Sequence, residues 1–292
     1  MSLCIFIQQR LRQTEHRIPP HRQCFNVGGH FKRHRANGQT TMQNDFTYKI
    51  IEPDKSLADF VESFWFLKHQ SDDNAEKVVV PDGKIDLVLS KPETKPFHIT
   101  LIGLETKPKL NPSYPNSISC AISFKPLATE YILRYSIADI LDSKKILPND
   151  FWNFYADDLN DFEAFCEKAS QKIQSLLPKD IDNRKQKLFE LIYATNGAIS
   201  VKELSEKVFW SRQQINRYFN QQFGLSLKAY CNIIRFRASF QHIKEGKLFP
   251  QQNFTDQSHF IKEVKKLSSA LPKELKQNQN ERFIQFSVLD PK

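Results

Sequence analysis

The sequence predicts an α+β protein in which a β-rich N-terminal part is followed by an all-α C-terminal part. Residues 117–124 alternate strictly between apolar and small side chains, as expected of a strand with one buried face. The last third of the chain carries apolar residues at helical spacing, with short turns between the helices. Charge changes at the same boundary, because residues 42–180 have a net charge of minus 6 and residues 181–292 have plus 9.

Short strands broken by proline and glycine are predicted over residues 48–124. Within them, residues 77–80 and 85–89 are predicted to form a hairpin around the turn 81–84. Proline fixes φ at a turn corner, and Gly83 accepts a positive φ. Trp65 and Phe124 are expected in the core, and Asp82 and Asp86 are interpreted as turn-capping and strand-edge residues.

Helices are predicted on both sides of these strands. The first rests on an i, i+3, i+4, i+7 pattern formed by Leu57, Phe60, Val61 and Phe64. Residues 127–177 are predicted to be helical with an interruption near Pro148, and residues 178–183 to be a linker.

Composition excludes several classes of protein. No apolar run approaches the roughly 18 consecutive residues that a membrane helix needs, and residues 4–7 are too short for the core of a signal peptide. The 5 cysteines are scattered without a CxxC pair, which predicts neither a disulfide framework nor a structural zinc site. A reducing cytoplasm is therefore the expected compartment.

The first 41 residues are basic, with a net charge of plus 6, and show no helical or strand periodicity. We predict that this segment is disordered. Two interpretations are open: a basic tail that contacts nucleic acid, or a stretch upstream of a true start at Met42.

The basic C-terminal part is predicted to contain three or more helices. The apolar stripe of the first ends before Asn196-Gly197, where glycine can provide a left-handed cap. Ser200 is predicted to cap the second helix, with Glu203 at the spacing of a capping box. A third helix follows the turn 209–211 and buries Ile215 and Phe219, so that its opposite face carries Gln213, Asn216, Arg217 and Asn220.

This outer face has the chemistry of a DNA-reading helix. A helix, a three-residue turn and a second helix can place that second helix in a major groove. There, arginine can donate two hydrogen bonds to guanine, and asparagine or glutamine can pair with adenine. The alternative from the same pattern is the solvated polar face of an ordinary three-helix domain.

Specific residues support the first alternative: Val201 to Val208, Ser211 to Phe219, Phe223, Gly224, Ser226, Tyr230, Arg235 and Ala238. At these positions the sequence resembles the first half of the AraC/XylS-type DNA-binding domain. Residues 253–265, followed by Leu271-Pro272, resemble the second recognition helix of that family. The resemblance covers about residues 183–277 and implies a tandem helix-turn-helix domain, whose two units are joined by one long helix, here about 227–244.

The resemblance also implies which residues contact DNA. Arg212 falls where the first recognition helix meets phosphate, and the base-contacting positions of that helix hold Gln213, Asn216 and Arg217. The corresponding positions of the second helix hold Gln257, Ser258, Ile261 and Lys262. Asp256 is expected to be the N-cap of that helix, with Phe260 and Val264 buried and His259 as a packing or capping residue.

The sequence departs from the family at two places. Residues 245–252 are several residues shorter than the usual scaffold helix and contain Gly246 and Pro250, which disfavour a helix interior. The second unit is therefore expected to be incomplete. In the first unit's turn, Phe209 or Trp210 replaces the usual glycine, and we expect these residues to pack against the helices instead of touching DNA.

The N-terminal part resembles, at fewer positions, the sensor domain of some bacterial regulators: Phe64-Trp65, residues 81–87, Ile102-Gly103 and residues 124–126. This resemblance implies a small β-rich, cupin-like fold with appended helices. A cupin-type enzyme needs clustered metal ligands, whereas this part offers His69 and His98 in separate segments. With no nucleophile signature and no phosphate-binding loop, the sequence predicts neither an enzyme nor a cofactor nor a metal site.

The sequence thus predicts a bacterial, cytoplasmic, DNA-binding transcriptional regulator. Its expected domains are the segment 1–41, a sensing or dimerising domain over 42–180 and a DNA-binding domain over 181–292. The expected partners are double-stranded DNA, a small-molecule effector, a second copy bound through the N-terminal half and RNA polymerase, but no membrane. The first alternative is a ligand-binding or protein-interaction module with a degenerate DNA-binding half. The second is an enzyme, which requires that His69 and His98 converge on a metal ion.

Overall fold

The computed structural model describes residues 39–43, 46–70, 76–112, 116–249, 254, 256–279 and 282–287. All of these described residues belong to one compact unit. Of the segment predicted to be disordered, residues 1–38 lie outside the described residues, and residues 39–41 belong to the first strand. No helix in the described part of the chain is long and apolar enough to cross a membrane.

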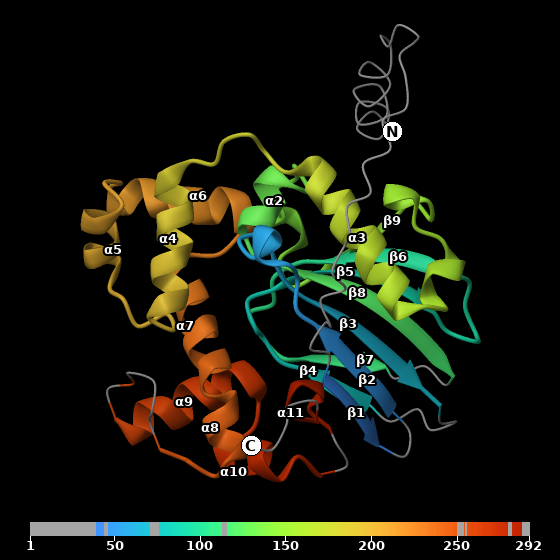
Figure 1. Ribbon diagram of the computed structural model, residues 1–292. Coiled ribbons are helices and arrows are strands. Elements are labelled where there is room, and N and C mark those ends of the chain that lie inside the picture. The colour runs from blue at the N-terminus through green and yellow to red at the C-terminus, as the bar shows by residue number, and fades with distance from the viewer. Residues whose placement is uncertain are drawn as a thin grey trace, which may run out of the picture. The chain divides into compact units, whose positions relative to one another are not determined.

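A seven-stranded antiparallel sheet forms most of the N-terminal part (Figure 1). Its spatial order is β1 (Gln39–Gln43), β2 (Phe46–Ile51), β3 (Val61–His69), β8 (Ser117–Phe124), β5 (Ile85–Lys91), β6 (His98–Ile102) and β9 (Lys144–Leu147). A second sheet pairs β4 (Glu76–Val79) with β7 (Lys109–Pro112). The α+β class is confirmed.

The predicted strand 117–124 is β8, which lies between β3 and β5. Its expected core face is buried at Cys120, Ile122 and Phe124, and the opposite face is also buried at Ala121 and Ser123. A strand with neighbours on both sides and cover on both faces is the centre of the sheet.

The predicted hairpin over 77–89 is wrong, although its turn forms. Gly83 has φ +78°, and the Asp82 side chain accepts a hydrogen bond from the Lys84 amide at 3.1 Å. The two flanking strands enter different sheets, because β4 pairs with β7 whereas β5 pairs with β6 and β8. The turn therefore carries the chain from one sheet to the other.

The helix predicted from the spacing of Leu57 to Phe64 is also wrong. After the single turn η1 (Lys55–Leu57), the chain enters β3. A β-bulge between Val61 and Ser63 inserts an extra residue, which shifts the alternation of faces by one position. Val61 and Phe64, three residues apart, are consequently both buried and imitate helical spacing.

The segment 127–177, predicted to be helical, is helical at its two ends. It begins with α2 (Leu127–Tyr131) and ends with α3 (Phe162–Leu176); between them lie η2 (Ala138–Ile140), β9, η3 (Phe151–Asn153) and η4 (Ala156–Leu159). Left-handed backbone at Arg134, Asp142 and Trp152 prevents a continuous helix. α3 covers the sheet, with the ring centroid of Phe162 5.7 Å from that of Phe66.

The C-terminal part is all helical within the described residues. Its helices are α4 (Asn183–Ala194), α5 (Val201–Lys207), α6 (Arg212–Phe223), α7 (Leu227–Ala238), α8 (Phe240–Lys244), α9 (Gln257–Ser268), α10 (Pro272–Gln277) and α11 (Ile284–Ser287). The long helix expected over 227–244 is interrupted at Ser239, whose hydroxyl donates to the Phe236 carbonyl at 2.6 Å.

The last described residues return to the small sheet. The Val78 amide donates to the Arg282 carbonyl at 2.6 Å. The Gln285 side chain accepts from the Val80 amide at 3.2 Å and donates to the Val80 carbonyl at 2.9 Å. Residues 282–287 therefore provide hydrogen-bond partners for the backbone groups of Val78, in β4, and Val80, just after it.

Candidate nucleic-acid interface

Helices α5 and α6 are joined by a short turn, and both have well-defined starts. The Ser200 hydroxyl accepts from the Glu203 amide at 3.1 Å, as the sequence predicts. At the start of α6, the Ser211 hydroxyl accepts from the Gln214 amide at 3.2 Å, and the Gln214 side chain accepts from the Ser211 amide at 3.0 Å. This reciprocal capping box fixes where α6 begins.

The inner faces of the unit are apolar. Leu204 and Val208 of the first helix and Ile215, Phe219 and Phe223 of the second are buried. Phe219 also packs against Phe189 of α4, with ring centroids 5.7 Å apart. This packing fixes the rotation of α6 and so decides which side chains remain outside.

The outer face of α6 carries the four predicted DNA-binding residues of the first unit. Arg212, Gln213 and Arg217 are exposed, and Asn216 is half-buried and donates to the Arg212 carbonyl at 3.1 Å. Neither arginine forms an ion pair with another described residue. The structure thus brings these four side chains together on one solvent-facing surface, called here the α6 outer face.

Helix α9 has the predicted start and the predicted buried stripe. Asp256 accepts from the His259 amide at 2.8 Å, and Phe260 and Val264 are buried. The His259 ring lies 5.7 Å from that of Phe254 in an edge-on contact, as expected of a packing residue.

The predicted DNA-binding residues of α9 divide into two groups. Gln257, Ser258 and Lys262 are exposed, whereas Ile261 is half-buried and packs against the core. Ile261 therefore presents less surface to a partner than its position in the resemblance implies.

Helix α7 contacts both α6 and α9. On the α9 side, the Asn232 side chain donates to Glu263 at 3.2 Å. Before α9, residues 245–249 form no helix, and Gly246 has φ +83°. The shortened stretch 245–252 thus lacks a scaffold helix over its described part, and residues 250–252 lie outside it.

The turn before α6 agrees with one expectation and contradicts another. Trp210 packs against Tyr218, with ring centroids 5.3 Å apart, and the Arg184 guanidinium lies 5.4 Å from the Trp210 ring. Phe209, in contrast, is 90% exposed. The expectation that these residues pack against the helices is confirmed for Trp210 and wrong for Phe209.

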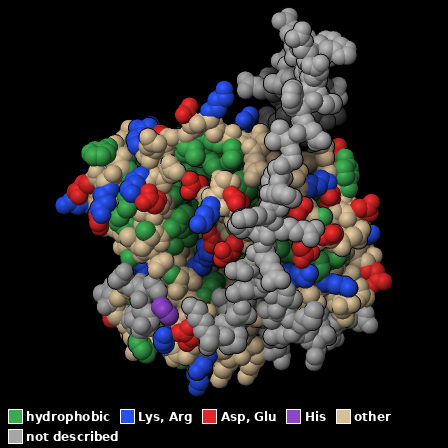
Figure 2. Space-filling view, viewed as in Figure 1, with side chains coloured by type: hydrophobic (Ala, Val, Ile, Leu, Met, Phe, Trp, Pro, Cys, Tyr) green, Lys and Arg blue, Asp and Glu red, His purple; other side chains and the backbone are tan. Residues whose placement is uncertain are grey.

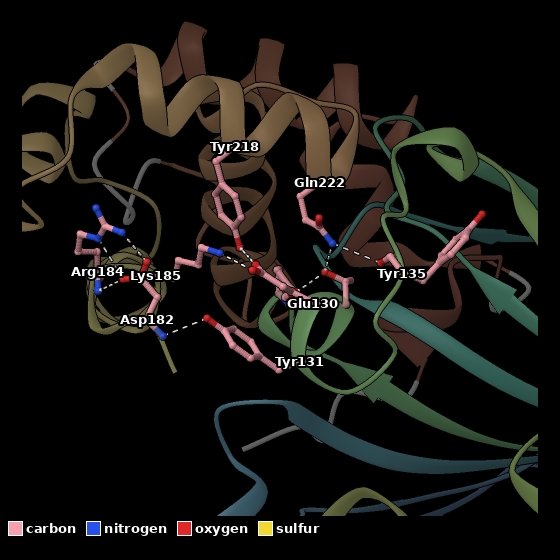
Figure 3. Close-up of polar contacts among 10 residues, drawn as sticks. Glu130, Tyr131, Tyr135, Asp182, Arg184, Lys185, Tyr218 and Gln222 are labelled. Atoms are coloured by element: carbon pink, nitrogen blue, oxygen red, sulfur yellow. Dashed lines mark hydrogen bonds and ion pairs between the residues drawn. The ribbon is translucent and has the colours of Figure 1, made fainter. Parts of the chain in front are cut away.

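One side of α6 is attached to the N-terminal part (Figure 3). The Tyr218 hydroxyl donates to Glu130 at 3.3 Å, and Lys185 of α4 forms an ion pair with the same carboxylate. The Gln222 side chain donates to the Thr129 hydroxyl at 3.0 Å and to the Tyr135 carbonyl at 3.3 Å. We call this set the α2–α6 contact; the sequence pattern contained no signal for it.

A second attachment joins β3 and the turn at Gly83 to α7. The Tyr230 hydroxyl donates to the Gly83 carbonyl at 3.3 Å, and Arg237 forms an ion pair with Glu62. Lys125 lies 3.5 Å from the same carboxylate. Burial raises the pKa of Glu62, but the nearby Arg237, Lys84 and Lys125 outweigh it and hold that pKa at about 2.

The sheet contains a buried carboxyl group on β5. Asp86 accepts a hydrogen bond from Ser123, and burial, followed by the charge of Asp82, raises its pKa to about 6. His69 and His98 lie on β3 and β6, which are separated in the sheet by β8 and β5. Within the described ranges, no group of three or more His, Cys, Asp or Glu residues is arranged to hold a metal ion.

Basic and acidic side chains are interspersed on the face drawn in Figure 2, including the part where Figure 1 places α4 to α6. Some of these charges are paired, such as Lys207 with Glu203 at 3.1 Å on α5.

One family model matches part of the chain. Residues 49–145 match a domain of unknown function, DUF6597. A search of the curated proteins finds no match.

Among solved structures, the chain is similar to ToxT from Vibrio cholerae, with a TM-score of 0.38 and 14% identity over 79% of this chain and 97% of that one. It is also similar to unsaturated fatty acid-bound wild-type ToxT from Vibrio cholerae strain SCE256, with a TM-score of 0.39 and 14% identity over 80% and 96% of the two chains.

The DUF6597 region supplies the N-terminal side of both attachments described above. Glu130 and Thr129 of the α2–α6 contact lie in it, as do Glu62 and Gly83, which contact α7. Any change within this region that moves α2 or the Gly83 turn therefore acts directly on α6 or α7.

Proposed function

We propose that this protein is a sequence-specific DNA-binding transcriptional regulator of the AraC/XylS type. Its C-terminal helices bind duplex DNA, and its DUF6597 region controls that binding. It acts in the bacterial cytoplasm and performs no chemical reaction.

The α6 outer face is the observation that carries this proposal. A buried stripe and a capping box fix the orientation of α6, and Arg212, Gln213, Asn216 and Arg217 share its solvent side. Arginine, glutamine and asparagine are the side chains that read guanine and adenine in the major groove. We assign Gln213, Asn216 and Arg217 to bases and Arg212 to phosphate.

Helix α9 contributes the second set of contacts. Gln257, Ser258 and Lys262 face solvent beside the exposed Lys265 and Lys266. Ile261, being half-buried, contributes an apolar edge at most. Because the described part of 245–252 forms no scaffold helix, the second unit adds less sequence preference than the first.

Control passes through the two attachments between the DUF6597 region and the helices. An effector or a second copy of the chain that binds the N-terminal half would shift α2 or the Gly83 turn, and with them α6 and α7. Control of this kind needs an element with two arrangements that both sites bias. The proposal also includes a contact between the DNA-bound regulator and RNA polymerase.

Selection of bound sequences from a random duplex library by the full chain, with affinity measured across a salt series, tests the proposal. A selected motif with salt-dependent affinity is expected, since phosphate contacts release counterions. Two half-sites about ten base pairs apart would mean that both α6 and α9 read DNA. Binding that selects no motif, with or without cell extract that supplies an effector, would contradict the proposal.

A second candidate function is favoured by one observation, namely the engagement of α6 through Tyr218 and Gln222. In this alternative the helices are a fixed part of a ligand-binding or protein-interaction module, and their DNA-binding half is degenerate. The same selection separates the two, because a degenerate half binds all duplexes alike.

A further inference from the structure

Phe209 occupies a backbone position that ordinarily requires glycine. Helix α5 ends at Lys207, and the Trp210 amide donates to the Ser205 carbonyl at 3.2 Å, which is the hydrogen bond of a Schellman motif. In that motif the residue after the C-cap is left-handed, and Phe209 accordingly has φ +52°. Glycine adopts this conformation without strain, whereas a side chain with a Cβ does not.

The Phe209 side chain is also 90% exposed, the largest value among the exposed large apolar side chains of the described chain. Its neighbour Trp210 packs against Tyr218, so the turn itself does not need Phe209 for packing. Backbone strain and an exposed aromatic ring are both unfavourable in the free protein. Residues retained at such a cost are characteristic of functional sites.

The position of Phe209 relates it to the α6 outer face. It lies two residues before Ser211, the N-cap of α6, and three before the exposed Arg212. In a helix-turn-helix unit, the N-terminal residues of the second helix contact base edges. Phe209 thus borders the end of α6 that enters the groove, and the apolar feature of that groove is the thymine methyl group.

We propose that Phe209 contacts DNA and packs against a thymine methyl group at the edge of the major groove read by α6. This inference rests on the proposed function and adds a specificity-determining residue to it. Duplex DNA is favoured over a protein partner because the neighbouring Trp210 packs against Tyr218, and the exposed residues that come next, Ser211, Arg212 and Gln213, are polar. A protein-binding surface would be expected to gather several exposed apolar side chains.

Three variants of the full chain separate the roles of Phe209. Phe209→Gly removes both the ring and the strain, Phe209→Asn removes the ring and tolerates the left-handed backbone, and Phe209→Leu keeps an apolar side chain. Ile146→Thr, which alters another exposed apolar side chain (60% exposed) on β9, is the matched control.

We expect Phe209→Gly to unfold at an unchanged or higher temperature and to bind the selected duplex about tenfold more weakly. Phe209→Asn should lose a similar factor, Phe209→Leu should lose less, and Ile146→Thr should bind as the unaltered chain does. Loss of affinity together with retained stability excludes misfolding as the cause.

Thymine-to-uracil replacement identifies the contacted base. Removing one 5-methyl group should weaken binding of the unaltered chain about fourfold at one position of the duplex, and Phe209→Gly should be insensitive to that replacement. Unimpaired binding by Phe209→Gly would overturn the inference, and a change confined to self-association would assign the ring to a protein interface. If the unaltered chain is folded but selects no duplex, the proposed function itself is contradicted. A failure of the Phe209 inference alone would leave the selection by the unaltered chain intact.

Discussion

The hydroxyl of Tyr218 on α6 donates to the carboxylate of Glu130 on α2 at 3.3 Å, across 88 residues of sequence. Burial, followed by the charge of Glu130, raises the pKa of Tyr218, so the phenol stays protonated as a donor. One side of α6 is thereby attached to the DUF6597 region (Figure 3), while Arg217 on its outer face is exposed. The helix proposed to read DNA is therefore held on one side by the N-terminal half.

Removing the charge of Glu130 should destabilise the fold. We expect Glu130→Gln to lower the free energy of unfolding by about 1 to 2 kcal/mol, because Lys185 and Tyr218 lose a charged acceptor in a half-buried contact. Urea denaturation of Glu130→Gln, Lys185→Met and the double variant measures the coupling between the two residues. Additive losses would contradict a direct interaction.

The neighbouring pair Lys187 and Glu190 provides the matched control. These residues also lie on α4 and are 2.9 Å apart, but their side chains are 48% and 60% exposed. Exposed pairs contribute little, so Glu190→Gln should leave the unfolding curve unchanged.

Gly83 is expected to tolerate no larger residue. Its φ is +78°, and an added Cβ would lie 2.7 Å from the Cδ1 atom of Ile234 on α7. Gly83→Ala should therefore cost about 2 kcal/mol of stability, from left-handed backbone and overpacking together.

A second variant divides this cost. Gly83→Ala with Ile234→Val should recover the overpacking share, since valine lacks the Cδ1 atom. Gly246→Ala, also left-handed at φ +83° but facing the flexible end of Lys276, should show the backbone cost alone. Equal losses of stability in Gly83→Ala and Gly246→Ala would show that the Ile234 side chain moves aside without a measurable loss of stability.

Local chemistry explains which elements could be predicted from the sequence. The caps at Ser200 and Asp256 depend on residues within three positions, and both form as predicted. The strand at 117–124 has a uniform alternation that no helix shares, and it is β8. The buried and exposed faces of α6 follow from the same short-range periodicity.

Long-range pairing explains the failures. The strand at 77–80 found its partner in β7 and in residues 282–285, which no local pattern indicates. The bulge at Val61 depends on the partner strand β8, and it produced a false helical spacing. The acceptor of Tyr218 is equally remote, so the attachment of α6 was not predictable.

The pH dependence of stability should reflect Asp86. Burial, followed by the charge of Asp82, raises its pKa from 3.8 to about 6, so the folded state binds this proton more tightly than the unfolded state. The corresponding stability is present below about pH 4 and is lost as the pH rises to about 6. Between pH 4 and pH 7.5, the unfolding temperature should fall less in Asp86→Asn than in the unaltered chain.

Two variants complete this pH experiment. Burial also raises the pKa of Glu105 to about 7. Ionisation of Glu105 should therefore still lower the unfolding temperature of Asp86→Asn as the pH rises. Adding Glu105→Gln should flatten the profile further, and the exposed Asp157→Asn is the charge-matched control. If Asp86→Asn leaves the dependence of unfolding temperature on pH unchanged, a group other than Asp86 causes that dependence.

Arg217 is the residue whose replacement should change what the protein reads. Its guanidinium is exposed on the α6 outer face and forms no ion pair within the described chain, so folding does not depend on it. We expect Arg217→Ala to weaken binding of the selected duplex by about 1 to 3 kcal/mol and to relax the preference at one base position. Lys144→Ala, exposed on the sheet-edge strand β9, removes the same charge from the N-terminal part and should leave the affinity and the base preference unchanged. An equal loss on every duplex, accompanied by a smaller salt slope, would make Arg217 a phosphate contact, since a phosphate carries no sequence information.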